Sequence, residues 1–268
     1  MFEKYRVTLD KKLDLDKFDP ADKPFAGESK SDDRARMDEL SVLLDDLQNR
    51  LHASAKHRVL LVLQGMDTSG KDGTIRAVFQ TVNPLGVRVA NFKAPTPTEL
   101  AHDFLWRVHR QAPAAGELVI FNRSHYEDVL ITRVHDWIDA DECKRRIEHI
   151  NHFEKLLADS DTLILKCFLH ISKDAQRERL QERVDDPQKH WKFDPTDLKE
   201  RAFWPEYQKA YASALSATST EWAPWYIVPS DSKRHRNLMV AELLVAALSR
   251  LGLDFPPPKP ELEGLKIE

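Results

Sequence analysis

The sequence of 268 residues has only two cysteines, Cys143 and Cys167, and their spacing fits neither a metal site nor a disulfide framework. It also has no excess of positive charge, because 44 acidic residues against 40 basic ones give a net charge of −4, which argues against a general nucleic-acid binder. No run approaches the about twenty apolar residues of a membrane-spanning helix, and the charged N-terminal segment lacks an apolar signal core. These absences predict a cytoplasmic protein that binds neither nucleic acid nor membrane, in which any anion site is a local concentration of lysine and arginine.

Glycine is scarce, yet three of the eight glycines lie in one stretch, VLLVLQGMDTSGKDGT, at residues 59–74. The stretch opens with a short apolar run that indicates a buried strand, and a helical pattern begins at Ile75. A glycine-rich turn between a strand and a helix is the context of a phosphate-binding loop. Gly65 and Gly70 let the backbone approach an anion, to which backbone N–H groups and the helix N-terminus point. Lys71 adds a full positive charge.

The loop departs from the usual phosphate-loop pattern at one position. Asp72 follows Lys71, where a serine or threonine normally supplies a hydroxyl for Mg²⁺. Asp67, inside the loop, is a carboxylate that can hold the metal instead. The alternative is a chance glycine turn, which the flanking strand and helix disfavour.

The rest of the chain alternates between strand and helix patterns, which predicts a parallel sheet with helices on both faces. A three-four spacing of apolar residues from Met37 to Leu51, after a cap at Asp32 or Asp33, predicts a helix that covers the sheet or, alternatively, contacts a second subunit. The expected strands are 59–64, 87–92, 118–121, 162–171 and 225–228. The other expected helices start at Ile75 and Thr98 and at Ser172, and cover about 125–136, 140–158, 197–216 and 233–251.

One domain, 1–268, is expected, because no linker rich in glycine or serine divides the chain. Its parts are an extended N-terminal arm (1–31), an excursion at about 172–200, and an extended tail (252–268). The segment Asn122–Asp128 follows the third expected strand, and ligands bind at this end of the strands in open α/β sheets.

Four segments, QGMDTSGKDGT, FNRSHYEDVL, RLQERVDDPQKHWK and STEWAPWYIVPSD, together resemble the family-2 polyphosphate kinases. The resemblance extends from about Tyr5 to about Leu251, and the FNRSHYED form is similar to the third subgroup of that family, which uses AMP and ADP. It implies a P-loop kinase fold related to thymidylate kinase: a three-layer α/β/α sandwich with a five-stranded parallel sheet and a helical lid at about 172–200.

The resemblance also implies an activity. The terminal phosphate of inorganic polyphosphate would be transferred reversibly to AMP and ADP, forming ADP and ATP, with Mg²⁺ as cofactor and a homodimer or homotetramer as the assembly. An ATP-dependent kinase of a nucleotide or small molecule is the alternative. A non-catalytic sensor is a third hypothesis, which the joint presence of Asp67, Lys71 and Arg123 disfavours.

The same resemblance assigns roles to individual residues. Asn122 stands where many relatives have aspartate, and an amide is a weaker, neutral metal ligand. The predicted catalytic residues are Asp67, Lys71, Asn122, Arg123 and Glu127, of which Asp67 and Asn122 are also the predicted metal ligands. The predicted phosphate-binding residues are Thr68, Ser69, Gly70, Lys71, Asp72, Gly73, Thr74, Lys93, Arg133, Arg179, Arg183 and Lys192.

Three of these residues have a plainer interpretation. Asp67 can serve only the helix dipole, and Arg123 can form a structural ion pair. Arg179 can belong to a solvated helical face, so Arg183 and Lys192 are the stronger lid candidates.

Overall fold

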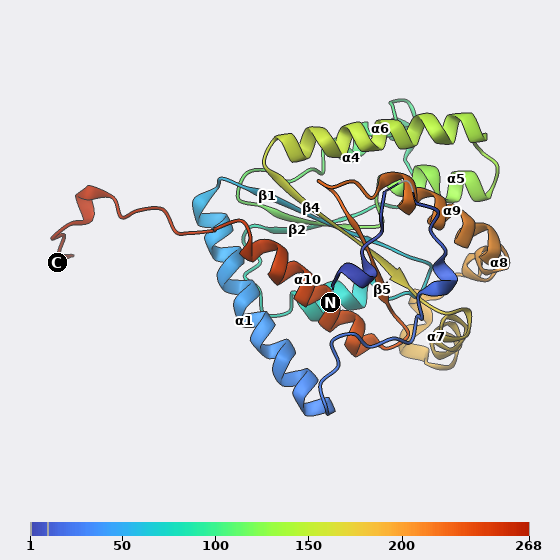
Figure 1. Ribbon diagram of the computed structural model, residues 1–268, viewed down its shortest axis with the longest axis horizontal. Coiled ribbons are helices and arrows are strands. Elements are labelled where there is room, and N and C mark those ends of the chain that lie inside the picture. Colours follow the sequence, from blue (N-terminus) through green and yellow to red (C-terminus); the bar gives the residue numbers. More distant parts are fainter. Residues whose placement is uncertain (1, 10, 268) are drawn as a thin grey trace.

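Five parallel strands form one sheet in the order β2-β3-β1-β4-β5, as shown in the computed structural model, which describes residues 2–9 and 11–267 (Figure 1). The strands are β1 (Arg58–Gln64), β2 (Val87–Asn91), β3 (Leu118–Asn122), β4 (Thr162–His170) and β5 (Trp225–Pro229). The predicted α/β fold with five parallel strands is confirmed. The central strand, β1, pairs with β3 and β4, which explains why it reads as a continuous apolar run.

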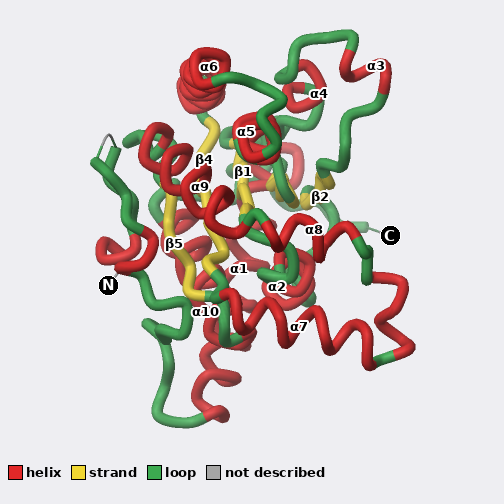
Figure 2. The backbone as a smooth tube through the Cα atoms, turned by 90° about the vertical axis from the view of Figure 1, so that its right-hand side faces the viewer, coloured by secondary structure: helices red, strands yellow, loops and turns green. Residues whose placement is uncertain are grey.

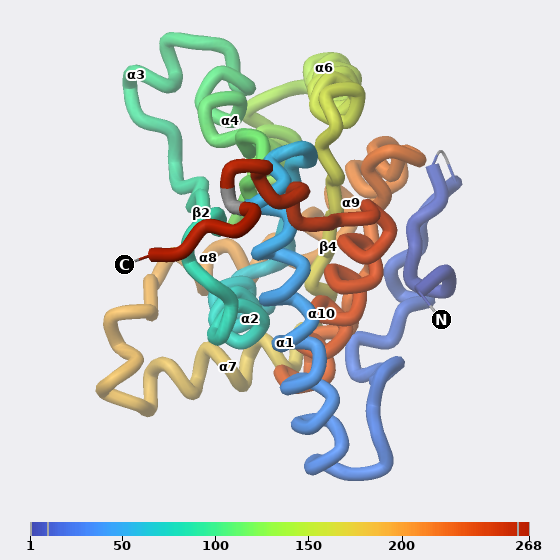
Figure 3. Tube along the Cα trace, turned by 90° about the vertical axis from the view of Figure 1, so that its left-hand side faces the viewer, coloured from blue at the N-terminus to red at the C-terminus, as the bar shows by residue number. Residues whose placement is uncertain are grey.

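The side chains of β1 alternate between two buried clusters, one on each face of the sheet. Leu60 and Val62 join the cluster under α6 (Ala140–Asp159) and α9 (Trp204–Thr218). Leu61 and Leu63 join the cluster under three other helices, α1 (Lys30–Ser54), α2 (Lys71–Val78) and α10 (Lys233–Ser249). Figure 3 shows α1 running beside α10 and α2. The molecule therefore has the predicted three layers.

The first long helix covers the sheet, as the apolar spacing predicts. Leu40, Leu44 and Leu51 are fully buried against it. The helix begins one turn earlier than expected, because Ser29 rather than Asp32 or Asp33 is the cap: its Oγ accepts from the Asp32 N–H, and the Asp32 carboxylate accepts from the Ser29 N–H.

Three expected helices are shorter or divided. The helix expected from Thr98 is two single turns, α3 (Pro97–Leu100) and α4 (Trp106–His109), with Thr96 as the first cap. The stretch 125–136 divides into a 3₁₀ helix (His125–Val129) and α5 (Ile131–Val134). The stretch 197–216 divides into α8 (Thr196–Ala202) and α9, because Pro205 has no N–H with which to continue α8. The excursion also contains α7 (Lys173–Asp185) and a 3₁₀ helix (Pro187–Lys192).

The two ends of the chain differ in how they meet the body. Val7 N donates to Trp225 O at 2.9 Å, so the N-terminal arm covers the edge of β5. The arm also contains two 3₁₀ helices, Phe2–Tyr5 and Leu15–Lys17. Beyond Leu253 the tail leads away from the body and carries one 3₁₀ turn, Pro260–Leu262 (Figure 1).

No helix within residues 2–9 and 11–267 combines the length and the apolar character needed to cross a membrane.

An ion pair is buried between β4 and α6. Lys166 Nζ donates to Glu154 Oε2 at 2.5 Å, and both side chains are fully buried. The same ammonium donates to Tyr126 Oη and Thr218 O, each at 2.8 Å, and Tyr126 donates to Glu154. Burial lowers the pKa of Lys166 to about 8. Burial alone would raise the pKa of Glu154, but the positive charge of Lys166 outweighs this effect and holds the pKa of Glu154 below its ordinary value. The pair is therefore charged at neutral pH and fixes the segment that follows β3 against the core.

Removing one partner of this pair should be far more damaging than removing both. Glu154→Ala leaves the Lys166 ammonium buried without a counter-charge, so we expect a loss of about 3–5 kcal/mol in the free energy of unfolding measured with urea. The double variant Glu154→Met, Lys166→Met should lose less than Glu154→Ala. The matched control is Asp159→Ala, which breaks the exposed Lys155–Asp159 pair on the same helix and should cost less than about 1 kcal/mol. A double variant that loses the sum of the two single losses would contradict this account.

Candidate active site

The turn between β1 and α2 can be built only with glycine at two positions. Gly70 has φ +104°, and a Cβ there would lie 1.9 Å from Arg236 Nη1. Gly65 has φ +152°, and a Cβ there would lie 2.6 Å from Leu169 O. Both backbones and both close approaches exclude a side chain. The result is the predicted strand, turn and helix, with α2 beginning at Lys71.

Lys71 is folded onto its own loop. Its Nζ donates to Gly65 O at 2.6 Å and to Met66 O at 3.3 Å, and the side chain is buried. Burial, together with the nearby charge of Arg123, lowers the pKa of Lys71 to about 8. Three carboxylates oppose this shift electrostatically: Asp67, Glu127 and Asp72. The structure therefore brings the predicted catalytic lysine together with the predicted carboxylates.

Arg123 connects the end of β3 to the loop. Its Nη2 donates to Asp67 Oδ1 at 2.6 Å. Arg123 therefore does form an ion pair, as its alternative interpretation predicts, and the partner is the aspartate of the loop. Arg123 has φ +59°, a left-handed backbone that a non-glycine residue adopts at a cost and that is frequent at functional sites. Burial opposes its charge, but Glu127 and Asp67 hold the pKa of Arg123 above its ordinary value. Burial also raises the pKa of Glu127, against the charges of Arg123 and Lys71.

Asn122 and Asp72 form a second link between β3 and the loop. Asn122 Nδ2 donates to Asp72 Oδ1 at 2.6 Å and to Asn91 Oδ1 at 2.8 Å. The parallel pairing of β2 and β3 places Asn91 directly beside Asn122. Asn122 thus links the end of β3 to Asp72 at the start of α2, and its amide oxygen accepts no hydrogen bond from either neighbour.

These donors fit Mg²⁺. They are oxygen atoms of two aspartates, Asp67 and Asp72, and of the Asn122 amide. Mg²⁺ typically uses one or two carboxylates and completes its shell with water and substrate phosphates. Within the described part of the chain, no three His, Cys, Asp or Glu side chains are grouped as ligands of one metal ion. Among the described residues, no hydrogen-bond partner lies within reach of the buried hydroxyl oxygens of Thr68 and Ser69.

The excursion 172–200 reaches the site, and Figure 2 shows α7 and α8 on either side of the start of α2. Burial and the charge of Asp67 raise the pKa of Asp197, on α8, to about 6. Arg183 Nη1 donates to Asp197 Oδ2 at 3.2 Å and to Lys192 O at 2.9 Å. Lys192 Nζ lies 4.8 Å from the ring centroid of Trp191, which is 78% exposed.

Arg179 lies behind the phosphate loop, where it is only 8% exposed. The interpretation that it belongs to a solvated helical face is therefore wrong. Its guanidinium donates to backbone carbonyls of the loop, Thr68 O at 2.8 Å and Ser69 O at 3.2 Å.

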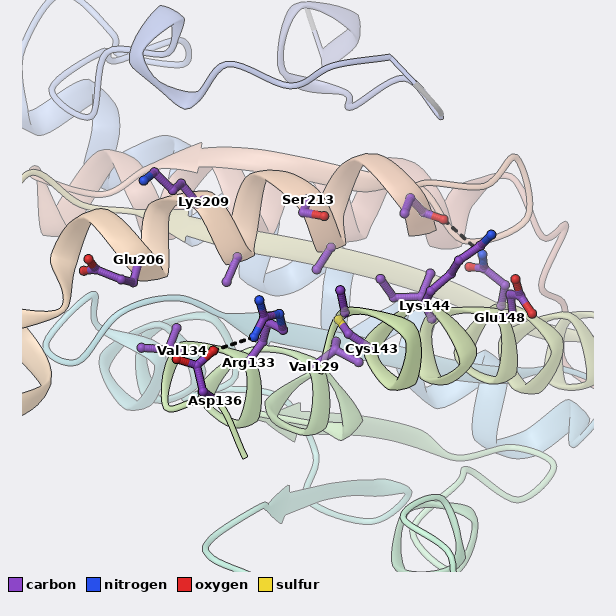
Figure 4. Close-up of a pocket in the computed structure, with 16 residues that line it drawn as sticks. Val129, Arg133, Val134, Asp136, Cys143, Lys144, Glu148, Glu206, Lys209 and Ser213 are labelled. Carbon is purple, nitrogen blue, oxygen red and sulfur yellow. Dashed lines mark hydrogen bonds and ion pairs between the residues drawn. The ribbon is translucent and has the colours of Figure 1, made fainter. Parts of the chain in front are cut away.

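Two predicted phosphate-binding residues lie apart from this cluster. Lys93 is exposed after β2, and its carbonyl accepts from Arg107 at 2.8 Å. Arg133 is paired with Asp136 at 2.7 Å in a pocket of about 690 Å³ lined by residues of α5, α6 and α9 (Figure 4). The loop contributes no residue to that pocket.

The sequence analysis missed three residues that contact or approach the loop: Gln176, Asp197 and Arg236. Gln176 Nε2 donates to Asp67 O at 3.1 Å, and Arg236 Nη1 donates to Ser69 O at 2.9 Å. The one available signal was position, because Arg236 follows the carboxyl end of β5, on the same edge of the sheet as the loop.

The sequence profile of the family described as Polyphosphate kinase 2 matches residues 27–253 of the chain. The chain belongs to the polyphosphate kinase 2 family. It is 52% identical over 270 residues to the AMP/ADP-polyphosphate phosphotransferase of Meiothermus ruber, with 99% of this chain and 100% of that protein covered. It is 42% identical to the ADP-polyphosphate phosphotransferase of Rhodopseudomonas palustris, with 96% and 93% covered.

A family member of known structure shares the fold. The crystal structure of polyphosphate kinase 2 from Arthrobacter aurescens matches this chain with a TM-score of 0.92 at 44% sequence identity. The match covers 96% of this chain and 93% of that one. The P-loop kinase fold that the resemblance implied is therefore confirmed.

The depressed pKa of Lys71 predicts a pH profile. Because this pKa is lowered from its ordinary value to about 8, Lys71 loses its charge as the pH rises through about 8 in the free protein. The kcat/KM for a phosphate donor reports the free enzyme and should therefore fall above about pH 8. Phosphate groups complete their ionisation near pH 6, so the donor adds no inflection to the profile near pH 8.

The control for this profile is Lys71→Arg, which is less active but keeps its charge throughout the range. Its kcat/KM should therefore not fall as the pH rises through about 8. An unchanged inflection in Lys71→Arg would assign the titration to another group.

Proposed function

We propose that this protein transfers the terminal phosphate of inorganic polyphosphate to AMP and ADP, forming ADP and ATP in reversible reactions. The observation that carries the proposal is the full-length similarity, at 52% identity, to a protein named AMP/ADP-polyphosphate phosphotransferase. The site supports it, because a loop with glycines at its two tight positions and two nearby cations, Lys71 and Arg123, suits a chain of phosphates. We further propose a cytoplasmic homo-oligomer, a dimer or tetramer.

Phosphoryl transfer depends mainly on positioning and on neutralising charge at phosphate oxygens. In the free protein Lys71 Nζ is held by the carbonyls of Gly65 and Met66, so it lies inside the loop that would receive the phosphate. Arg123 would contact the donor or acceptor phosphates from the end of β3 while its pair with Asp67 fixes its direction. Arg183 and Lys192 would approach from the excursion.

Mg²⁺ is the proposed cofactor. Asp67, Asp72 and the amide oxygen of Asn122 would hold it, and it would neutralise charge on the phosphate oxygens. The Asn122 amide donates to Asp72, and Arg123 donates to Asp67, so each carboxylate has one fixed oxygen and a second that remains for the metal.

The proposed use of two acceptors follows from the same residues. The attacking oxygen belongs to the α-phosphate of AMP in one reaction and to the β-phosphate of ADP in the other, so the acceptor must bind at two depths. A neutral Asn122 holds metal less rigidly than an aspartate and would tolerate both depths. Glu127, the half-buried carboxylate beside Arg123 and Lys71, would fix the acceptor.

The test uses purified protein with AMP, polyphosphate and Mg²⁺, without adenylate kinase, followed by chromatography over time. ADP should appear first and ATP after it. If AMP is untouched while ADP is consumed, the acceptor range is wrong. If neither nucleotide takes phosphate from polyphosphate but ATP phosphorylates a hydroxyl acceptor, the ATP-dependent alternative replaces the proposal.

One variant tests whether the FNRSHYED motif or the lid determines which nucleotides the protein accepts. Glu127→Asn should lose AMP use selectively, by about tenfold or more in kcat/KM relative to ADP, because it removes a partly buried carboxylate beside the acceptor. Asp197→Asn, which neutralises a carboxylate on the lid side, is the matched control and should affect both acceptors alike. Equal losses for the two acceptors in Glu127→Asn would show that the motif does not set the acceptor range.

A further inference from the structure

Three consecutive carbonyls of the phosphate loop are held from outside the loop by long side chains. Gln176 Nε2 donates to Asp67 O at 3.1 Å, and Arg179 Nη1 donates to Thr68 O at 2.8 Å. Ser69 O accepts from both Arg179 and Arg236, at 3.2 and 2.9 Å. These donors come from α7 and α10, two helices far apart in the sequence.

The direction of these carbonyls sets the direction of the N–H groups. In a trans peptide the N–H points opposite to the C=O of the same unit, and the described residues contain no cis peptide. Holding Asp67 O and Ser69 O toward α7 and α10 therefore turns the N–H groups of Thr68 and Gly70 to the opposite side, where an anion would bind. The Ser69 N–H is used within the loop, since it donates to Met66 O at 3.0 Å.

The two arginines are buried cations without a carboxylate partner. Arg179 and Arg236 are 8% and 2% exposed, and neither forms an ion pair within residues 2–9 and 11–267. Arg179 donates to four backbone carbonyls, those of Thr68, Ser69, Ser230 and Asp231. Burial and the charge of Arg179 lower the pKa of Arg236 to about 9. Two like charges thus lie behind the loop in a setting where charge is weakly screened.

We infer that Arg179 and Arg236 are paired positioning residues that direct the loop N–H groups at a bound phosphate and supply positive charge from behind. The inference rests on the proposed function in that the anion is a phosphate of polyphosphate or of a nucleotide. Such an anion compensates the two buried charges, so the pair favours the bound state over the free one.

Arg179 also holds the first part of the excursion against the end of β5. Arg179 Nη2 donates to Ser230 O at 2.6 Å and Asp231 O at 2.8 Å, at the end of β5. From α8, Arg201 donates to Gln176 Oε1 at 2.7 Å, which orients the amide that holds Asp67 O. The first turns of α7 are therefore tied both to the loop and to the end of β5.

The experiment compares Arg236→Lys, which keeps the charge, with Arg236→Gln, which keeps a donor for Ser69 O but no charge. Binding of tripolyphosphate and of ADP is measured separately by titration calorimetry, together with kcat, KM and the melting temperature of the free protein. Arg236→Gln should weaken tripolyphosphate binding by about tenfold or more while the free protein melts no lower than wild type. Arg236→Lys should recover most of the affinity.

The control is Arg177→Met, which removes an exposed arginine of α7 that pairs with Asp174 and should change none of these quantities. The inference is overturned if Arg236→Gln lowers the melting temperature but leaves the affinity and kinetics of the folded protein unchanged. It is also overturned if Arg177→Met weakens binding equally. Failure of the proposed function looks different: wild type would bind the probes through the loop, with the same dependence on Arg236, yet transfer no phosphate from polyphosphate.

Discussion

The structure depends on positive charge buried around one loop in a molecule whose net charge is negative. Lys71 is inside the loop, Arg123 closes it from the end of β3, and Arg179 and Arg236 lie behind it. Each of these cations is satisfied by carbonyls or by a single carboxylate, so the free protein holds charge that a polyanion can neutralise. Glycine at positions 65 and 70 is required because the backbone and the cations crowd the places where a Cβ would lie.

The sheet explains why these groups meet. β1, β3 and β5 are parallel, so the loop, the FNRSHYED segment and the start of α10 all follow strands at the same edge. The ion pair of Lys166 and Glu154 holds the FNRSHYED segment from below through Tyr126. The excursion forms the remaining side of the site. Arg179, on α7, ties the excursion to the loop through hydrogen bonds to Thr68 O and Ser69 O. Residues from all three layers of the fold thus position the site, whereas the candidate catalytic residues lie at one edge of the sheet.

The sequence predicts a contact well when the residues that make it are close together in the chain, and poorly when they are far apart. The strand, turn and helix around Gly65 to Lys71 are specified by adjacent residues, so their pattern predicts both structure and ligand class. The pattern over 197–216 does not predict the break between α8 and α9, although Pro205 marks it. The sequence names Arg179 as a phosphate-binding candidate but does not predict its contacts, and it does not point to Arg236. The loop carbonyls that accept from these arginines are 110 and 167 positions away, and only the folded sheet brings them together. The sequence does not predict the Asn122–Asp72 link either, since the two residues lie on different elements, 50 positions apart.

The central claim is that this loop receives a phosphate directly from polyphosphate. The most direct measurement is a rapid-quench, single-turnover reaction of excess protein with end-labelled polyphosphate, AMP and Mg²⁺, in wild type and in Lys71→Ala. The account predicts that label enters the β-phosphate of ADP and that Lys71→Ala slows this step by about a hundredfold or more, at about 3 kcal/mol, while the protein stays folded. Label that never enters nucleotide, or equal rates in the two proteins, would contradict it.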